Sequence, residues 1–233
     1  MISLRNVTLF RPGSRRQSLI LEDASLDLPP RARVGILAAP GSGKSTLARM
    51  VSGIEEPDFG WITRQGSVSW PLGFAGFLHV YLTVADNMTF VAELCGVPPR
   101  HAMVFCENFI GDAFRPNARI EDLAPGERAT LAFACSLMRE WDFYVVDETI
   151  SVGDAATRAK CDAILEQRLA NAGMLLLSRN ARMLGQKTNA HFALIQHKIV
   201  PVTDLTLAEQ AVTAHRQNTD TKPKQTAEGL LDV

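Results

Sequence analysis

The sequence is poor in cysteine and has no cysteine pattern typical of a disulfide scaffold or a zinc site. Its 233 residues include four cysteines, at positions 95, 106, 135 and 161, and none of them forms a C-x-x-C pair. Their separations fit no metal-binding framework. Free cysteine is among the residue types most often buried, so we expect four buried thiols acting as small apolar side chains. Such thiols fit a reducing compartment.

The sequence also lacks a secretion signal, a long apolar run and an excess of basic residues. Residues 1–5, MISLR, show no charged segment followed by an apolar one. No apolar run approaches the roughly 20 residues needed to cross a bilayer. The formal net charge is −1, so no nucleic-acid partner is expected, because such proteins normally present a basic domain or stripe. We therefore expect a cytosolic protein that another chain must hold if it works at a membrane.

The composition and the hydrophobic patterning indicate an α/β fold. Hydrophobic residues make up 46% of the chain and charged residues 21%, which is typical of a globular domain. Strands are expected at residues 2–10, 18–28, 34–37, 143–146, 173–178, 192–195 and 198–202. Helices are expected after residue 46, across residues 83–139 and at residues 155–169; Thr83 and Asp86 are close to a capping box. Short apolar strands alternating with helices predict a mainly parallel sheet covered on both faces.

A glycine-rich segment directly after the predicted strand at residues 34–37 indicates a phosphate-binding loop. Glycine lets the backbone curl so that its N–H groups point at an anion, and the helix that follows adds partial positive charge. Lys44 is expected to reach the β- and γ-phosphates, and Ser45 to give its hydroxyl to Mg²⁺. The strict pattern has glycine where this sequence has Ala38, and a methyl group is tolerated there if φ is negative. The predicted loop residues are Pro40, Gly41, Ser42, Gly43, Lys44, Ser45 and Thr46.

A pair of acidic residues further along the chain supports this interpretation. The apolar run FYVV at residues 143–146 ends in Asp147 and Glu148. Asp147 is predicted to lie beside the loop and to hold Mg²⁺ through water. Glu148 is predicted to orient and polarise the attacking water. An acidic pair after a strand is common on its own, but together with the loop it predicts a site that binds Mg-ATP and hydrolyses ATP.

Three further segments narrow the interpretation to a family. They are SWPLG at residues 69–73, LTVADN at residues 82–87 and VDE at residues 146–148, followed by SVGD at residues 151–154. With the phosphate loop, they make residues 2–202 resemble the ATP-binding subunits of ABC transporters. More narrowly, the chain is similar to those that export capsular and related polysaccharides across the bacterial inner membrane, which have V-G-D where most relatives have A-L-D. It is too short for the carbohydrate-binding domain often appended in O-antigen exporters, which favours the capsule type.

The resemblance implies an architecture and a set of partners. The fold would be a RecA-like P-loop NTPase core with an N-terminal antiparallel β part and an inserted helical subdomain at about residues 77–140. The ATP-binding domain would span residues 1–216, and the polar residues 217–233 are expected to form a mobile tail. Two copies, or a paired cassette, would sandwich ATP. A separate polytopic membrane subunit would handle the polysaccharide and hold the protein at the cytoplasmic face of the inner membrane.

Several positions would contact the nucleotide if the family roles carry over. Phe10 stands where an aromatic residue stacks on adenine, although simple core packing is an alternative. The segment LAPGE at residues 123–127 stands at the signature position, which caps the ATP of the other copy through residues such as Ala124 and Gly126. Ala124 lacks the usual serine hydroxyl, and Pro125 lacks an N–H. Asp154 ends the V-G-D loop.

Two more positions depart from the family pattern. His79 stands where a glutamine usually senses Mg²⁺ and touches the membrane subunit; it is alternatively only a polar loop residue. Arg179 stands where the family has a switch histidine, and its guanidinium would suit the γ-phosphate. The apolar loop around Tyr81 would dock on the membrane subunit, unless its side chains fold under the helical subdomain.

Three functions are compatible with these features. The first, which we prefer because Lys44, Ser45, Asp147 and Glu148 are all present, is an ATPase that drives polysaccharide export. The second is a regulatory or degenerate subunit that binds ATP but hydrolyses it poorly, which the altered positions at residues 79, 124–125 and 179 would favour. The third, a soluble ABC ATPase acting on ribosomes or DNA, usually has two cassettes or long coiled-coil insertions, and neither is found in this sequence.

Overall fold

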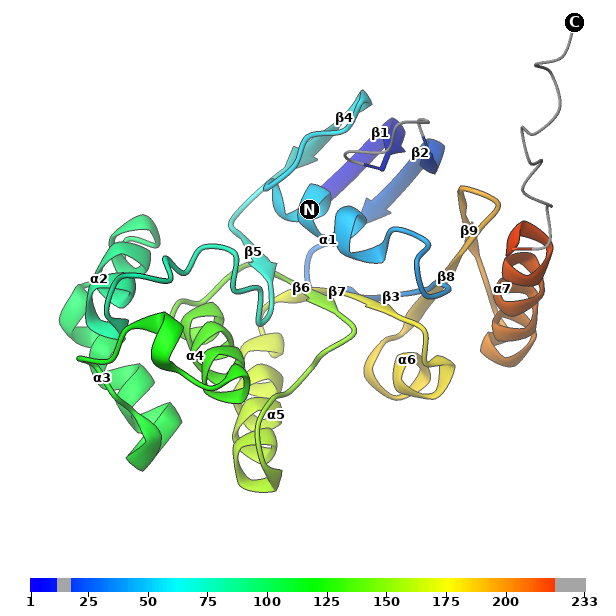
Figure 1. The fold of residues 1–233 in the computed structure, drawn as a ribbon. Helices are drawn as coiled ribbons and strands as arrows, with labels where there is room; N and C mark the ends of the chain where they lie inside the picture. The colour runs from blue at the N-terminus through cyan, green and yellow to red at the C-terminus, as the bar shows by residue number, and fades with distance from the viewer. Residues whose placement is uncertain (12–17, 221–233) are drawn as a thin grey trace, which may run out of the picture.

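The computed structural model describes residues 1–11 and 18–220 and contains two β-sheets (Figure 1). The smaller sheet is antiparallel, in the order β2-β1-β4. Its strands are β1 (Ile2–Phe10), β2 (Leu19–Leu28) and β4 (Phe59–Arg64). Alternate residues of β1 are buried, as its sequence pattern predicts. Strand β4 was not predicted, because it is an edge strand whose residues are mostly exposed.

The larger sheet has six strands in the order β5-β6-β7-β3-β8-β9. They are β3 (Arg33–Leu37), β5 (Val68–Pro71), β6 (Phe143–Asp147), β7 (Gly173–Ser178), β8 (Ala190–Ile195) and β9 (Lys198–Pro201). Every neighbouring pair is parallel except β8 and β9. The prediction of a mainly parallel sheet is therefore confirmed, and the central strands β3, β6 and β7 are buried along almost their whole length.

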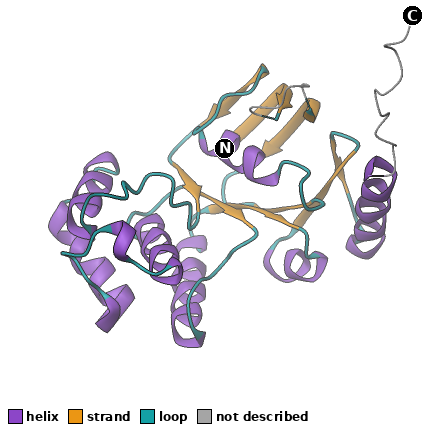
Figure 2. Ribbon diagram, in the orientation of Figure 1, coloured by secondary structure: helices purple, strands orange, loops and turns teal. Residues whose placement is uncertain are grey.

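Both faces of this sheet are covered, as predicted: α1 (Lys44–Ser52) and the smaller sheet lie on one face and helices on the other (Figures 1 and 2). A hydrophobic core fills the space on each face. One core lies between the two sheets and includes α1. The other lies on the opposite face and includes residues of α4 (Pro125–Leu137), α5 (Ala155–Leu169) and α6 (Ala181–Lys187). Tyr144 and Val146 of β6 point into the second core, and Phe143 and Val145 into the first, because successive side chains of a strand alternate between faces.

The helical region has a local origin that the sequence shows. Helix α2 (Val84–Leu94) begins with the predicted capping box: the Thr83 hydroxyl accepts the Asp86 N–H at 3.1 Å. Helix α3 (Pro99–Ile110) begins at a proline, which suits a first helical position. Short 3₁₀ turns, η1 (Gly111–Ala113) and η2 (Ile120–Asp122), lead to α4.

All four cysteines are buried and free, as predicted, and burial raises the pKa of the Cys95 thiol to about 11.

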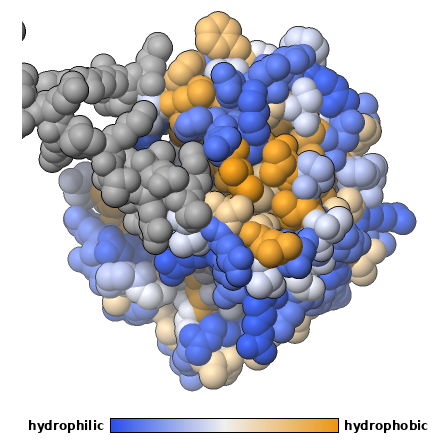
Figure 3. Space-filling model, turned by 90° about the vertical axis from the view of Figure 1, so that its right-hand side faces the viewer, coloured by the Kyte–Doolittle hydropathy of each residue, from blue (hydrophilic) through white to orange (hydrophobic). Residues whose placement is uncertain are grey.

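The last helix of the described chain overlaps the start of the predicted tail. Helix α7 (Leu205–Asp220) packs against β8 and α6, with Ala208 and Val212 buried. Residues 217–220, the first of the predicted tail, form the end of this helix; residues 221–233 lie outside the described part of the chain, so the mobility of the tail stays a prediction. The side of the molecule that carries α7 is mainly hydrophilic, with a small group of apolar residues near its centre (Figure 3). No helix within the described residues is long and apolar enough to cross a membrane.

Candidate nucleotide-binding site

The glycine-rich loop connects the end of β3 to the start of α1, at the carboxyl edge of the parallel sheet. Gly43 caps α1 with a φ of +101°, and a Cβ at this position would lie 2.4 Å from the Ile20 side chain. Both the conformation and the lack of space therefore require glycine. Ala38 is not among the non-glycine residues with positive φ in the described chain, which meets the condition for a methyl group there.

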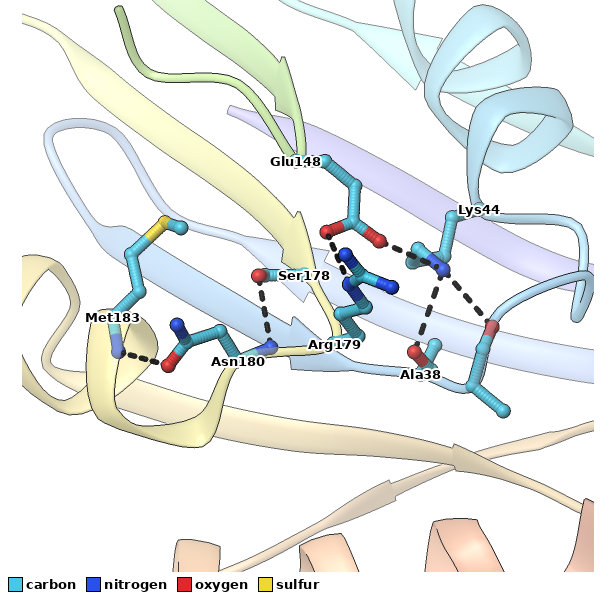
Figure 4. A network of polar contacts seen from close by, with 8 residues as sticks. Ala38, Lys44, Glu148, Ser178, Arg179, Asn180 and Met183 are labelled. Atoms are coloured by element: carbon cyan, nitrogen blue, oxygen red, sulfur yellow. Dashed lines mark hydrogen bonds and ion pairs between the residues drawn. The ribbon is translucent and has the colours of Figure 1, made fainter.

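Lys44 is a buried cation held by the loop itself and by Glu148 (Figure 4). Its side chain is 7% exposed, and its Nζ donates to the carbonyl of Ala39 at 2.9 Å and of Ala38 at 3.4 Å. The same Nζ lies 3.0 Å from Glu148 Oε1. A buried ammonium requires such partners, because removing it from water without them is costly.

Glu148 is aimed at Lys44 by an unusual backbone conformation. It follows β6 with a φ of +63°, and its N–H donates to the Leu177 carbonyl at 2.8 Å. A non-glycine residue with positive φ is uncommon and is typical of turns and functional sites. This conformation turns the chain off the strand and places the carboxylate between two cations, since Glu148 Oε2 also lies 3.9 Å from Arg179 Nε.

Hydrogen bonds fix the backbone on either side of Arg179 (Figure 4). The Asn180 N–H donates to the Ser178 hydroxyl at 3.1 Å, and the Asn180 carboxamide accepts the Met183 N–H at 3.0 Å, which caps α6. The Arg179 side chain itself is 68% exposed. The sequence predicted that Arg179 would lie at the γ-phosphate; in the structure its nearest charged partner is Glu148.

The two predicted Mg²⁺ residues line one pocket beside the loop. This pocket has a volume of about 350 Å³, and Ser45, Arg49, Gly73, Asp147 and Thr149 are among the residues that line it. Asp147 Oδ1 is buried and has no hydrogen-bond partner among the described residues. A buried carboxylate oxygen without a partner is unfavourable unless a cation or an ordered water satisfies it. A hydroxyl and a carboxylate are ligands that Mg²⁺ prefers, so this pair fits the ion.

Phe10 lies at the end of β1, next to the phosphate loop. It is half-buried and belongs to neither hydrophobic core of the described chain, which argues against the core-packing alternative. Its N–H donates to the Asp58 carboxylate at 2.7 Å, and the guanidinium of the next residue, Arg11, donates to the Gly41 carbonyl at 2.5 Å. Asp58 and Arg11 had no motif that identified them in the sequence.

The signature segment, residues 123–127, lies outside the pocket that Ser45 and Asp147 line. Ala124 is the N-cap of α4 without a side-chain hydrogen bond, and Pro125 is its first residue. Gly126 and Asp154 line a second pocket of about 260 Å³, with Glu127 and Gly153. Asp154 caps α5 by accepting the Thr157 N–H at 2.8 Å, and hydrogen bonds from Thr157 hold the pKa of Asp154 below its usual value. The fold therefore does not bring Ala124, Gly126 and Asp154 into the pocket that Ser45 and Asp147 line.

His79 lies on the exposed loop before α2. Its backbone is fixed by Asn87, whose carboxamide accepts the His79 N–H at 2.7 Å and donates to the His79 carbonyl at 3.1 Å. Its ring packs edge-on against Tyr81, with 5.9 Å between the ring centroids. His79 is not among the residues that line the pocket of Ser45 and Asp147.

Comparison with known proteins agrees with this arrangement. The model of the ABC transporter family matches residues 21–151, which include the phosphate loop and the acidic pair. The chain belongs to this family. It is an ATP-binding cassette, and the predicted family is confirmed. The match ends directly after the segment in which Glu148 turns towards Lys44.

Related proteins align with most of the cassette's sequence. It is 36% identical to the ATP-binding protein BexA of Haemophilus influenzae, over 77% of this chain and 83% of that one. It is 35% identical to the capsule polysaccharide export ATP-binding protein CtrD of Neisseria meningitidis serogroup B, over 80% and 86%. A dimeric post-hydrolysis structure of the cassette MJ0796 with ADP and Pi aligns with a TM-score of 0.70 at 16% identity, over 85% of this chain and 96% of that one. This likeness confirms the predicted fold class.

Proposed function

We propose that this cassette binds Mg-ATP at the loop of residues 38–46 and hydrolyses it to drive export of a capsular or related polysaccharide. The observation that supports this most directly is the convergence of Lys44, Glu148 and Arg179 beside the pocket of Ser45 and Asp147. Lys44 and Ser45 begin α1 after β3, Asp147 is the last residue of β6, and Glu148 and Arg179 directly follow β6 and β7, which are neighbours in one sheet with β3. The relative CtrD, which is named for capsule polysaccharide export, supports this cargo.

The residues have distinct proposed roles. The N–H groups of residues 41–46 and the start of α1 bind the phosphates, and Lys44 pairs with the β- and γ-phosphates. Ser45 and Asp147 hold Mg²⁺, which neutralises charge on the phosphates. Glu148 orients the attacking water and accepts its proton. Phe10 stacks on the adenine.

The Lys44–Glu148 ion pair implies an exchange of partners when ATP binds. Lys44 cannot pair fully with the γ-phosphate while it holds Glu148, because an ammonium has three N–H donors. The carbonyls of Ala38 and Ala39 and the Glu148 carboxylate take all three. We propose that the phosphate displaces the Glu148 carboxylate, which is then free to accept a proton from water. Arg179, 3.9 Å from the other carboxylate oxygen, keeps Glu148 within the site.

The exposed start of α4 is proposed to act on ATP bound by a second copy. Its segment lies outside the pocket beside its own phosphate loop, so Ala124 and Gly126 have no role there. The solved cassettes with this fold include dimers. Asp154 holds the start of α5 next to this segment.

The proposed ATPase is tested by steady-state phosphate release from the purified chain at saturating Mg-ATP, with and without its membrane subunit. Glu148→Gln supplies the background. Turnover no higher than this background under both conditions would contradict ATP hydrolysis.

The cargo is tested separately by deleting the gene. Capsular polysaccharide should then accumulate inside the cell. The unmutated gene should restore export, and the Lys44→Ala form should not.

We propose that the membrane subunit docks on an apolar surface formed by the loop before α2 and by α2 itself, and so holds the cassette at the cytoplasmic face of the inner membrane. Val80, Tyr81, Leu82, Phe90 and Leu94 are large apolar side chains that are exposed here. Contiguous exposed apolar surface is typical of partner sites. The neighbours Phe77 and Leu78, by contrast, pack against the core, so the alternative of a folded-under loop holds only for them.

A cysteine at position 81 should cross-link to the membrane subunit. Tyr81 is 66% exposed, so Tyr81→Cys places a reactive thiol on this surface without opening the core. The matched control is Leu207→Cys, at a position that is 62% exposed on α7, away from α2. Adducts should form from position 81 in the assembled complex and not from position 207; the reverse pattern would place docking elsewhere.

Replacing Arg179 by the family histidine should lower turnover. The guanidinium is the second cation beside Glu148, and a shorter imidazole would leave that carboxylate oxygen without its partner. We expect a loss of about tenfold in phosphate release for Arg179→His, because a positioned donor in an enzyme site typically contributes at least that much. Arg179→Lys should retain more activity. Higher turnover in Arg179→His would mean that Arg179 hinders the reaction.

A further inference from the structure

Arg115 connects the segment between η1 and η2 to the first turn of α4. One of its guanidinium nitrogens, Nη2, donates to both carboxylate oxygens of Glu127, at 2.8 and 2.7 Å. Glu127 Oε2 also accepts the Ala124 N–H at 2.7 Å. Arg115, Glu127 and Ala124 therefore form a continuous chain of hydrogen bonds at the start of α4.

Glu127 has opposite effects on the helix and on an anion. A carboxylate in the first turn stabilises a helix, because it satisfies an N–H that would otherwise be free. Here it accepts the N–H of Ala124 itself, while Ala124 has no side-chain group that could cap the first turn and Pro125 offers no N–H. The same negative charge would repel a phosphate brought to this helix start. Arg115 supplies the compensating charge at hydrogen-bond distance.

We propose that Arg115 is a positioning residue for ATP-dependent pairing of two cassettes. It neutralises Glu127 and keeps it on the Ala124 N–H, so that the start of α4 accepts the triphosphate of ATP bound by the second copy. This inference rests on the proposed function, in which that segment faces the partner's nucleotide. It adds a requirement for a positive charge, at Arg115, that lies outside the signature segment.

A purely stabilising role does not account for this ion pair. The side chains of Arg115 and Glu127 are 49% and 33% exposed. Exposed pairs contribute little to the free energy of unfolding, because water and salt screen them. Loss of Arg115 should therefore leave the fold intact and leave one uncompensated negative charge at the surface that meets the polyphosphate.

The test measures Mg-ATP-dependent dimerisation of the full chain by sedimentation in a Glu148→Gln background, at low and high salt. Arg115→Gln should weaken dimerisation by about tenfold at low salt and by less at high salt, because the repulsion is electrostatic. Arg115→Lys, which keeps the charge, should dimerise nearly as well as the parent. Arg115→Gln combined with Glu127→Gln should recover dimerisation, since neither charge remains and glutamine still accepts the Ala124 N–H.

The matched control is Arg119→Gln. Arg119 lies four positions after Arg115 and forms an exposed ion pair with Glu121, so this substitution removes the same charge from a different pair. Arg119→Gln should dimerise like the parent. Calorimetry should show that the ATP affinity of the monomer is unchanged in all these variants. Unchanged dimerisation of Arg115→Gln, or no recovery in the double variant, overturns the role of Arg115. A parent that binds Mg-ATP but never dimerises overturns instead the proposed pairing of copies, and this inference with it.

Discussion

Lys44→Ala is expected to abolish ATP binding and turnover. Lys44 is the cation that the loop itself provides, it is 7% exposed, and the carbonyls of Ala38 and Ala39 hold it in place. Alanine would leave the phosphates without their buried partner, and Glu148 would lose its closest cation. Loss of one positioned electrostatic partner costs about 10²–10³ in turnover, and loss of binding adds to this.

Calorimetry with Mg-ATP and steady-state phosphate release measure this effect. Lys198→Ala is a suitable control, because Lys198 forms an exposed ion pair with Glu22 at 3.3 Å outside the proposed site. It should bind ATP and release phosphate like the parent. If Lys44→Ala also retained both activities, the phosphates would have to bind elsewhere.

Glu148→Gln should separate binding from hydrolysis. Glutamine can hold the attacking water but cannot accept its proton, so phosphate release should fall by about 10²–10⁴. The Lys44–Glu148 ion pair predicts a second effect, because the uncharged glutamine competes less with the γ-phosphate for Lys44. ATP affinity should therefore rise, and ATP-bound dimers should accumulate.

Calorimetry and size exclusion with Mg-ATP test the two effects separately. Glu166→Gln removes a carboxylate that pairs with Arg33 and Lys187, outside the proposed site, and serves as the control. It should change neither turnover nor ATP affinity by more than about twofold. Parental turnover in Glu148→Gln would show that Glu148 has no catalytic role. Unchanged ATP affinity would contradict the exchange of partners at Lys44.

Much of the fold could be predicted because its signals are local. The capping box at Thr83, the proline at the start of α3 and the alternating burial of β1 each depend on a few adjacent residues. Strand β4 was missed because its stability comes from pairing with β1 and not from an apolar pattern. Gly60 makes that pairing possible: its φ is +82°, and a Cβ there would lie 2.4 Å from the Arg5 and Asn6 carbonyl oxygens. Helix α7 was missed because its apolar face is narrow.

For the candidate site, short sequence motifs already specify which chemical groups are present and where the chain turns. The glycine loop and the acidic pair after an apolar strand are short motifs, and local backbone geometry gives each its conformation. Which charges meet depends on how the strands and helices pack in three dimensions. Lys44 and Glu148 are distant in sequence, and they come together because β6, β7 and β3 are neighbours in one parallel sheet. The bond from Arg115 to Glu127 likewise depends on packing between elements, as does the burial of Asp147 Oδ1 without a hydrogen-bond partner in the part of the chain that the structure describes; a pattern within one segment does not encode such features.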